Sequence, residues 1–159
     1  MDLRILYAII LSFLPISELR GGLPLAILYA IDNKIPIILI FLAIVLVNIL
    51  GFLFAFYFLD NIHNLFMKIK IYKRFFEKYA LKLQKKADKF EKSYKNLGFL
   101  ALMIFVAVPL PGTGGWTGAL ISWFLGLNRK KSIIYISLGV LIAGIIILLG
   151  TLGIIRIFS

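Results

Sequence analysis

The stretch IPIILIFLAIVLVNILGFLFAFYFL, which runs from Ile35 to Leu59, carries no charged side chain. A second block, from Ser132 to Ile155, is also uncharged. A helix that crosses the hydrocarbon core of a bilayer needs about 20 predominantly apolar residues. Both blocks reach that length, so we expect two transmembrane helices. The whole chain is 62% hydrophobic, above the roughly 45–50% of soluble domains, and the sequence therefore predicts an integral membrane protein.

Two further apolar segments are interrupted by proline and glycine. They are Leu3–Ile31, with its break at Pro15–Gly22, and Leu97–Leu127, with its break at Pro109–Thr117. Proline and glycine stop helices, and each remaining arm is too short to cross about 30 Å alone at about 1.5 Å per residue. Each segment therefore either crosses once as a broken helix or returns to its own side as a re-entrant hairpin.

Basic residues distinguish these two options for the second interrupted segment. Eleven of the 18 Lys and Arg residues lie between Lys68 and Lys95, before the segment, and Arg129–Lys131 follow it. Cytoplasmic loops carry an excess of Lys and Arg, so both basic regions should lie on the cytoplasmic side. A hairpin allows this arrangement and a single crossing does not. The first interrupted segment has the same pattern of arms and break, so we expect a re-entrant hairpin there too.

The expected fold is an all-α integral membrane domain of two inverted repeats, residues 1–60 and 97–159. Each repeat would be a re-entrant helical hairpin followed by one transmembrane helix, which is a recurrent plan of transporters. Between them, residues 61–96 place apolar side chains at steps of three and four on one face and lysines on the other. This pattern predicts a basic amphipathic cytoplasmic helix. Its apolar face either lies in the inner membrane interface or pairs with another protomer.

Glu18 and Arg20 are charged residues inside the break of the first hairpin. Charges retained within a bilayer are costly and normally face a cavity or one another. In one interpretation, Arg20 binds an anionic group while Glu18 exchanges a proton or pairs with a cation. In the other, the two form an internal ion pair that locks the hairpin tip. We include Gly21 and Gly22, from the same turn, in the candidate binding site.

The second break is rich in glycine, which lets successive backbone N–H groups converge as an anion-binding nest. The arm after the break begins a helix, whose N-terminal dipole also favours an anion, and two threonines add hydroxyl donors. The candidate substrate-binding residues here are Pro111, Gly112, Thr113, Gly114, Gly115 and Thr117. The alternative is that these glycines serve only the close packing of a hairpin tip.

Other polar residues give weaker signals. Asn48, in the middle of the first predicted span, either lines a substrate path or hydrogen-bonds a neighbouring helix, and we include it in the candidate site. Gly139 and Ala143 are spaced for tight helix packing. The chain has no cysteine and a single histidine, and no catalytic set or zinc-ligand spacing occurs. We therefore expect no enzyme activity, metal or cofactor. Because the basic residues form one local block, we expect no nucleic-acid partner.

Two motifs make the chain resemble a known family. Ser17–Pro24 (SELRGGLP) and Pro109–Gly118 (PLPGTGGWTG) are similar to the two motifs of the family called putative small multidrug export proteins, short membrane proteins of bacteria and archaea. The resemblance covers essentially the whole chain. It implies a distant relationship to the DedA/VTT superfamily, whose members are proposed to carry paired re-entrant hairpins. Some of those members move lipids, including polyprenyl-phosphate carriers, across bilayers.

These expectations combine into a functional hypothesis. The chain would be a multi-pass transporter or lipid translocase of a prokaryotic cytoplasmic membrane. It would bind an anionic, phosphate-bearing lipid or amphiphile between its hairpins, with Glu18 as the carrier of a coupling proton. One alternative is an exporter of cationic amphiphilic drugs, and another is a non-transporting scaffold that binds lipid through the basic helix. Expected partners are membrane lipids and a second copy of the chain, because two spans make a thin wall around any path.

Overall fold

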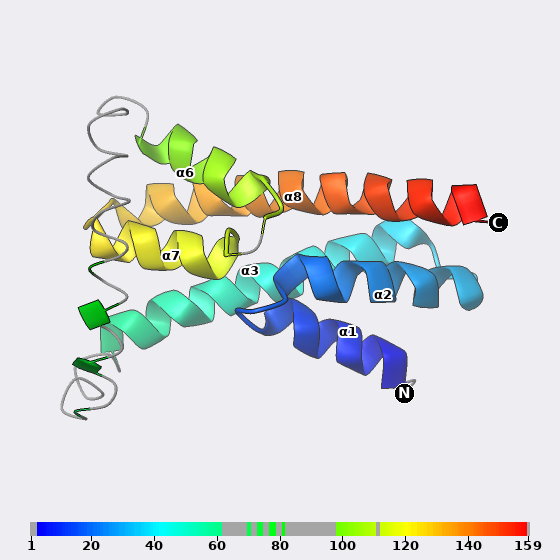
Figure 1. Cartoon of the computed structure of the whole chain (residues 1–159), viewed down its shortest axis with the longest axis horizontal. Coiled ribbons are helices and arrows are strands. Elements are labelled where there is room, and N and C mark those ends of the chain that lie inside the picture. Colours follow the sequence, from blue (N-terminus) through cyan, green and yellow to red (C-terminus); the bar gives the residue numbers. More distant parts are fainter. Residues whose placement is uncertain are drawn as a thin grey trace.

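The computed structural model describes residues 3–61, 98–110 and 112–158, together with the isolated positions 70, 73–74, 77–78 and 81. The continuous ranges form helices and contain no strand, as Figure 1 shows. The helices are α1 (Leu3–Phe13), α2 (Glu18–Asp32), α3 (Ile37–Asn61), α6 (Gly98–Ala107), α7 (Gly115–Phe124) and α8 (Arg129–Phe158). The prediction of an all-helical chain is confirmed for these ranges.

The two long helices, α3 and α8, coincide with the two predicted spans. Only 33% of the most apolar window of α3 and 22% of that of α8 is buried inside the protein. Most of their apolar side chains therefore face outward, which distinguishes them from the core helices of a soluble domain. By length and composition, both helices can cross a bilayer.

The first interrupted segment folds into a helical hairpin. Helices α1 and α2 pack against each other, and the turn between them covers residues 14–17, where Pro15 cannot continue α1. At the open end of the hairpin, Nη1 of Arg4 lies 2.7 Å from Oδ2 of Asp32. The segment thus begins and ends at the same end of the molecule, and its turn lies near the middle of Figure 1.

The predicted break in this segment was too long. Gly21 and Gly22, which were assigned to the break, lie inside α2, so the interruption stops at Ser17. The glycines serve close packing of two helices, because a Cβ on Gly22 would collide with the Ser12 hydroxyl and the Ala8 carbonyl of α1. The second break is also shorter than predicted, since α7 already begins at Gly115.

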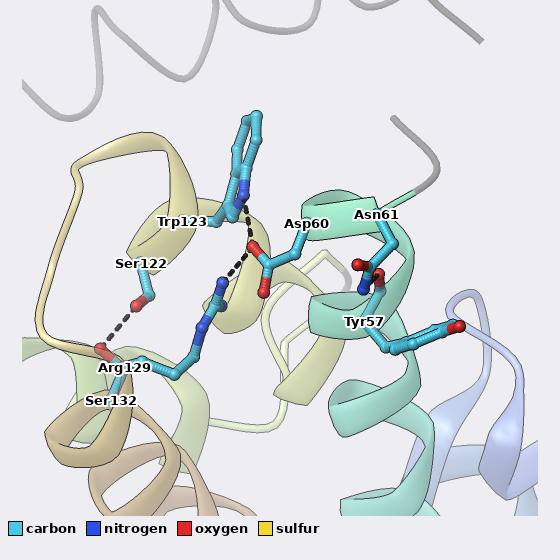
Figure 2. Close-up of polar contacts among 7 residues, drawn as sticks. All are labelled: Tyr57, Asp60, Asn61, Ser122, Trp123, Arg129 and Ser132. Carbon is cyan, nitrogen blue, oxygen red and sulfur yellow. Dashed lines mark hydrogen bonds and ion pairs between the residues drawn. The ribbon is translucent and has the colours of Figure 1, made fainter. Parts of the chain in front are cut away.

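The second interrupted segment forms a hairpin of α6 and α7 that starts from the opposite end of the molecule (Figure 1). At the start of α6, the Phe99 ring stacks on Tyr135 of α8 with 5.5 Å between centroids. At the end of α7, Nε1 of Trp123 donates to Asp60 at 3.0 Å, and Asp60 also pairs with Arg129 (Figure 2). Both arms of this hairpin therefore open beside the first two turns of α8.

The buried core lies where the hairpins meet the long helices. Phe52 and Ile44 of α3, Leu23 of α2 and Val140 of α8 are each 1% exposed or less. Gly139 permits α8 to approach α6, since a Cβ there would lie 2.7 Å from the Met103 carbonyl oxygen. The tight packing predicted at this glycine thus occurs within one chain.

The predicted amphipathic helix at 61–96 falls mostly outside the described residues. Positions 70, 73–74, 77–78 and 81 are helical, and Nζ of Lys73 lies 3.9 Å from Oε1 of Glu77 one turn later. This spacing agrees with a helix, but the described positions do not include the apolar face on which the prediction depends.

Candidate functional site

The two hairpin tips meet at Glu18, the first residue of α2. Its side chain points across to the N-terminus of α7, where Oε2 accepts from the Gly115 amide at 3.1 Å and Oε1 accepts from the Trp116 amide at 3.2 Å. The first amides of a helix have no intrahelical acceptor and attract negative charge. The anion position predicted at this helix is therefore filled by a carboxylate of the protein itself.

The backbone around this contact adopts unusual conformations. Glu18 has a φ of +47°, a left-handed conformation that costs a non-glycine residue about 1–2 kcal/mol. Gly114 has a φ of +150°, and a Cβ there would collide with Oε2 of Glu18. Only glycine leaves room for the carboxylate at this point, which is a specific reason for glycine in the second break. Strain of this kind is concentrated at functional sites.

Arg20 binds the second hairpin through a different residue. Nη2 of its guanidinium donates to the carbonyl oxygen of Thr113 and, at 2.9 Å, to the Thr113 hydroxyl. The hydroxyl is also held within the turn, 2.6 Å from the Val108 carbonyl oxygen. No Glu18–Arg20 ion pair occurs in the described part of the chain, so each of the two charges contacts the opposite hairpin instead of its neighbour.

Trp116, at the start of α7, connects the tip of the second hairpin to the end of α1. Its indole Nε1 donates to the carbonyl of Phe13 at 2.9 Å, and its ring lies edge-on to the Phe13 ring, with 6.2 Å between centroids. Gly51 of α3 allows this approach, because a Cβ there would lie 3.1 Å from the indole nitrogen. Helices α1, α3 and α7 thus share one junction beside the charged residues.

A cavity of about 10 Å³ lies between the tips, a volume that matches one water molecule. Glu18, Arg20 and Asn48 supply the polar part of its lining. The other lining residues are Leu19, Val106, Pro109, Gly114, Gly115, Val140, Ala143 and Ile147. The lining comes from α2, α3, α7, α8 and the end of α6 with the following turn, so both hairpins and both long helices build this cavity.

The structure brings together some of the predicted site residues and separates others. Glu18, Arg20, Asn48, Gly114 and Gly115 line the cavity, and Thr113 holds Arg20 beside it. By contrast, Gly21 and Gly22 face α1. Gly112 is exposed, and Thr117 is half-buried and absent from the lining. Pro111 lies outside the described residues.

Several residues that position the site gave no recognisable signal in the sequence. Ser12 supplies the carbonyl oxygen that accepts from Nδ2 of Asn48 at 2.9 Å, and Ser17 ties the first turn through its hydroxyl to the Leu11 carbonyl at 2.6 Å. Ser12 looks like an ordinary helix residue in the sequence, and Ser17 lies in the predicted break and the first motif without a role of its own. Their positions six residues and one residue before Glu18 are the available clue.

The fold and the site together define a class of protein. Two long helices with outward-facing apolar surfaces, and charged side chains held between two hairpin tips, are the features of a small helical membrane protein. The chain belongs to the family described as putative small multi-drug export protein, whose model matches residues 18–146. The matched region contains both hairpin tips. No match to the chain was found among curated proteins or among solved structures. The relationship to the DedA/VTT superfamily stays a prediction.

Proposed function

We propose that the chain is a multi-pass transporter of a prokaryotic cytoplasmic membrane that moves an anionic, phosphate-bearing lipid or amphiphile. Helices α3 and α8 would cross the bilayer. The α1–α2 and α6–α7 hairpins would enter it from opposite sides as the re-entrant parts of two inverted repeats. The description of the family as export proteins supports transport, and the opposite directions of the two hairpins support the repeat.

The observation that carries this proposal is the carboxylate of Glu18 on the amides of Gly115 and Trp116. A phosphate oxygen would find the same donors, since a helix N-terminus is a general anion site. Glu18 and the substrate therefore compete for one position. Protonation removes the negative charge of Glu18 and weakens its hold on these amides, so that uptake of a proton makes room for the phosphate. Binding of an anion and binding of a proton become coupled.

Arg20 would provide the second contact with the phosphate. A guanidinium has five N–H donors, and both hydrogen bonds from Arg20 to Thr113 use Nη2. The remaining donors can bind phosphate oxygens, for which the planar guanidinium is well suited. Because Arg20 lines the cavity together with Glu18, a phosphate that displaces Glu18 and widens the cavity could contact the guanidinium and the α7 amides at the same time.

Ligand-dependent thermal stabilisation of the purified protein in detergent tests the proposal. The ligands are polyprenyl phosphates and anionic phospholipids, compared with quaternary ammonium compounds. We expect phosphate-bearing lipids to stabilise the wild type and Arg20→Ala to abolish the effect. Arg20→Lys, which keeps the charge and loses the planar donor pair, should retain part of it. Equal stabilisation of wild type and Arg20→Ala would refute the phosphate site.

A second candidate function is export of cationic amphiphiles. The description of the family as multi-drug exporters favours it, and Glu18, in a cavity lined mainly by apolar residues, could serve as the counter-charge. This function requires that Glu18→Gln abolish stabilisation by quaternary ammonium compounds while Arg20→Ala spares it. A protein that responds to none of the ligands would instead support the scaffold hypothesis. In each case we propose a homodimer as the simplest assembly, which cross-linking in membranes can test.

A further inference from the structure

Asn48 has an unusual hydrogen-bonding state. Its side chain is fully buried, at 0% exposure, and its Nδ2 donates to the Ser12 carbonyl at 2.9 Å. Its Oδ1 has no hydrogen-bond partner in the described structure. A buried polar atom without a partner is rare and indicates an unseen water or ligand.

The orientation of this amide is determined by its neighbour. Asparagine nitrogen and oxygen are exchanged by a rotation of the side chain, so their assignment depends on the surrounding hydrogen bonds. If the Asn48 amide were rotated, two oxygens, Oδ1 and the Ser12 carbonyl, would face each other. The Ser12 carbonyl therefore holds Nδ2 on its own side and keeps Oδ1 on the other.

Asn48 lines the cavity between the tips, as does Glu18. Gly115 lies between α3 and the carboxylate, and a Cβ there would lie 3.4 Å from Oδ1 of Asn48. The same Cβ would lie 3.0 Å from the Phe52 ring, so Gly115 packs tightly beside Oδ1 and leaves no space for a side chain there. At about 10 Å³, the cavity has room for a molecule of the size of water and no larger.

The lining also indicates the chemistry of this ligand. Oδ1 of Asn48 and the Glu18 carboxylate are acceptors, so the ligand must donate hydrogen bonds. Glu18 and Arg20 are the charged residues in the lining, and α3, α6, α7 and α8 contribute no titratable group to it. The positive charge of Arg20 disfavours a second cation such as ammonium. A neutral, water-sized donor fits best, and the apolar walls supply no competing partner.

We propose that this cavity binds one water molecule between Oδ1 of Asn48 and the carboxylate of Glu18, and that this water delivers the coupling proton. The water accepts a proton from the solvent side as it gives another proton to a Glu18 oxygen, so it stays neutral and no second cation rests beside Arg20. The reverse transfer returns a proton to the solvent side. When Glu18 is protonated, its O–H donates to the water, which in turn donates to Asn48. Asn48 is thus a positioning residue, and the inference rests on the proposed role of Glu18 as proton carrier.

Infrared difference spectroscopy between high and low pH, on the full-length protein in liposomes, tests this proposal without any transport substrate. The carboxylic acid band of Glu18 is identified by its loss in Glu18→Gln. We expect Asn48→Leu to shift this band to higher frequency, because the acid loses its hydrogen-bonded chain. Asn48→Thr, which restores an acceptor of similar size, should move it back toward the wild-type position. An unshifted band in a folded Asn48→Leu protein would overturn the proposal.

A high-resolution structure of the wild type provides a second test that no variant can confound. We expect density for one water within hydrogen-bonding distance of Oδ1 of Asn48, and an empty cavity would overturn the inference. The two measurements also separate this inference from the proposed function. If no Glu18 acid band forms at any pH, the proton-carrier role fails. If the band forms but does not respond to Asn48, only the water route fails.

Discussion

The guanidinium of Arg20 donates to both the carbonyl and the hydroxyl of Thr113, although the two residues are 93 positions apart in the chain. One side chain of the first hairpin is therefore fixed to the backbone of the second. Together with the contact from Glu18 to Gly115, it makes the tips a single polar junction inside an apolar protein. The anionic substrate proposed above would have to compete with these contacts, and its binding would therefore require the two tips to separate.

Thr113→Val should destabilise the tip junction. The valine keeps the carbonyl that accepts from Arg20 but loses the hydroxyl, which also bonds the Val108 carbonyl at 2.6 Å. We expect the free energy of unfolding in mixed micelles to fall by about 1.5–3 kcal/mol, the range for hydrogen bonds to a charged group. Thr117→Val is the matched control, because Thr117 is half-buried and its hydroxyl makes no hydrogen bond in the described structure. Equal effects of the two changes would contradict a specific role of the Thr113 hydroxyl.

Gly114→Ala should destabilise the protein more than Gly112→Ala. Both glycines have positive φ angles, +150° and +82°, so both alanines carry backbone strain of about 1–2 kcal/mol. Only the alanine at position 114 would also collide with the Glu18 carboxylate, since a Cβ on Gly112 meets nothing within 4 Å. We expect the thermal midpoint to fall further for Gly114→Ala, and phosphate-lipid stabilisation to be lost in that variant alone. A similar loss in both variants would show that strain, and not the carboxylate contact, requires glycine at position 114.

Much of this fold is predictable because its signals are local. The uncharged runs that became α3 and α8 are visible in the composition alone, and Pro15 and Pro109 mark the two turns. The extent of the first break was wrong because glycine is ambiguous in a sequence. Gly22 could either end a helix or admit a close neighbour, and only the position of Ser12 on α1 decides between them.

The site was only partly predictable, for a different reason. The sequence identified Glu18, Arg20 and the glycine-rich turn as polar features of an apolar chain. It also suggested a pair between Glu18 and Arg20, because these two are neighbours. Their actual partners, Gly115 and Thr113, lie 97 and 93 residues away. Such contacts depend on how two hairpins are placed against α3, and no local pattern contains that information.

The ion pair between Asp60 and Arg129 should be stronger than the pair between Arg4 and Asp32 at the other end of the molecule. The guanidinium of Arg129 also lies 4.0 Å above the Phe56 ring, and Asp60 accepts from Trp123 (Figure 2). These additional contacts hold the Asp60–Arg129 pair in one geometry. The side chains of Arg129 and Asp60 are 35% and 43% exposed, whereas those of Arg4 and Asp32 are 64% and 57% exposed.

Double-mutant cycles with neutral replacements measure this difference. We expect a coupling energy of about 1 kcal/mol for Asp60→Asn with Arg129→Gln, and less than about 0.5 kcal/mol for Arg4→Gln with Asp32→Asn, within the range for exposed pairs. Asn at position 60 keeps an oxygen that can accept from Trp123. The cycle therefore measures the interaction between the charges of residues 60 and 129 and not the loss of the Trp123 hydrogen bond. A larger coupling for the outer pair would contradict the geometric argument.

Single cysteines should report the opposite directions of the two hairpins in a membrane. The native chain has no cysteine, so each added thiol can be labelled without background. Gly98 starts α6 and Lys130 lies in the first turn of α8, and a Cβ on Gly98 meets nothing within 4 Å. We expect Gly98→Cys and Lys130→Cys to react with a membrane-impermeant maleimide only from the cytoplasmic side, and Asn33→Cys only from outside. If Gly98→Cys and Lys130→Cys were labelled from opposite sides, α6 and α7 would cross the bilayer as one broken helix. The re-entrant arrangement, and with it the meeting of the two tips inside the membrane, would then be excluded.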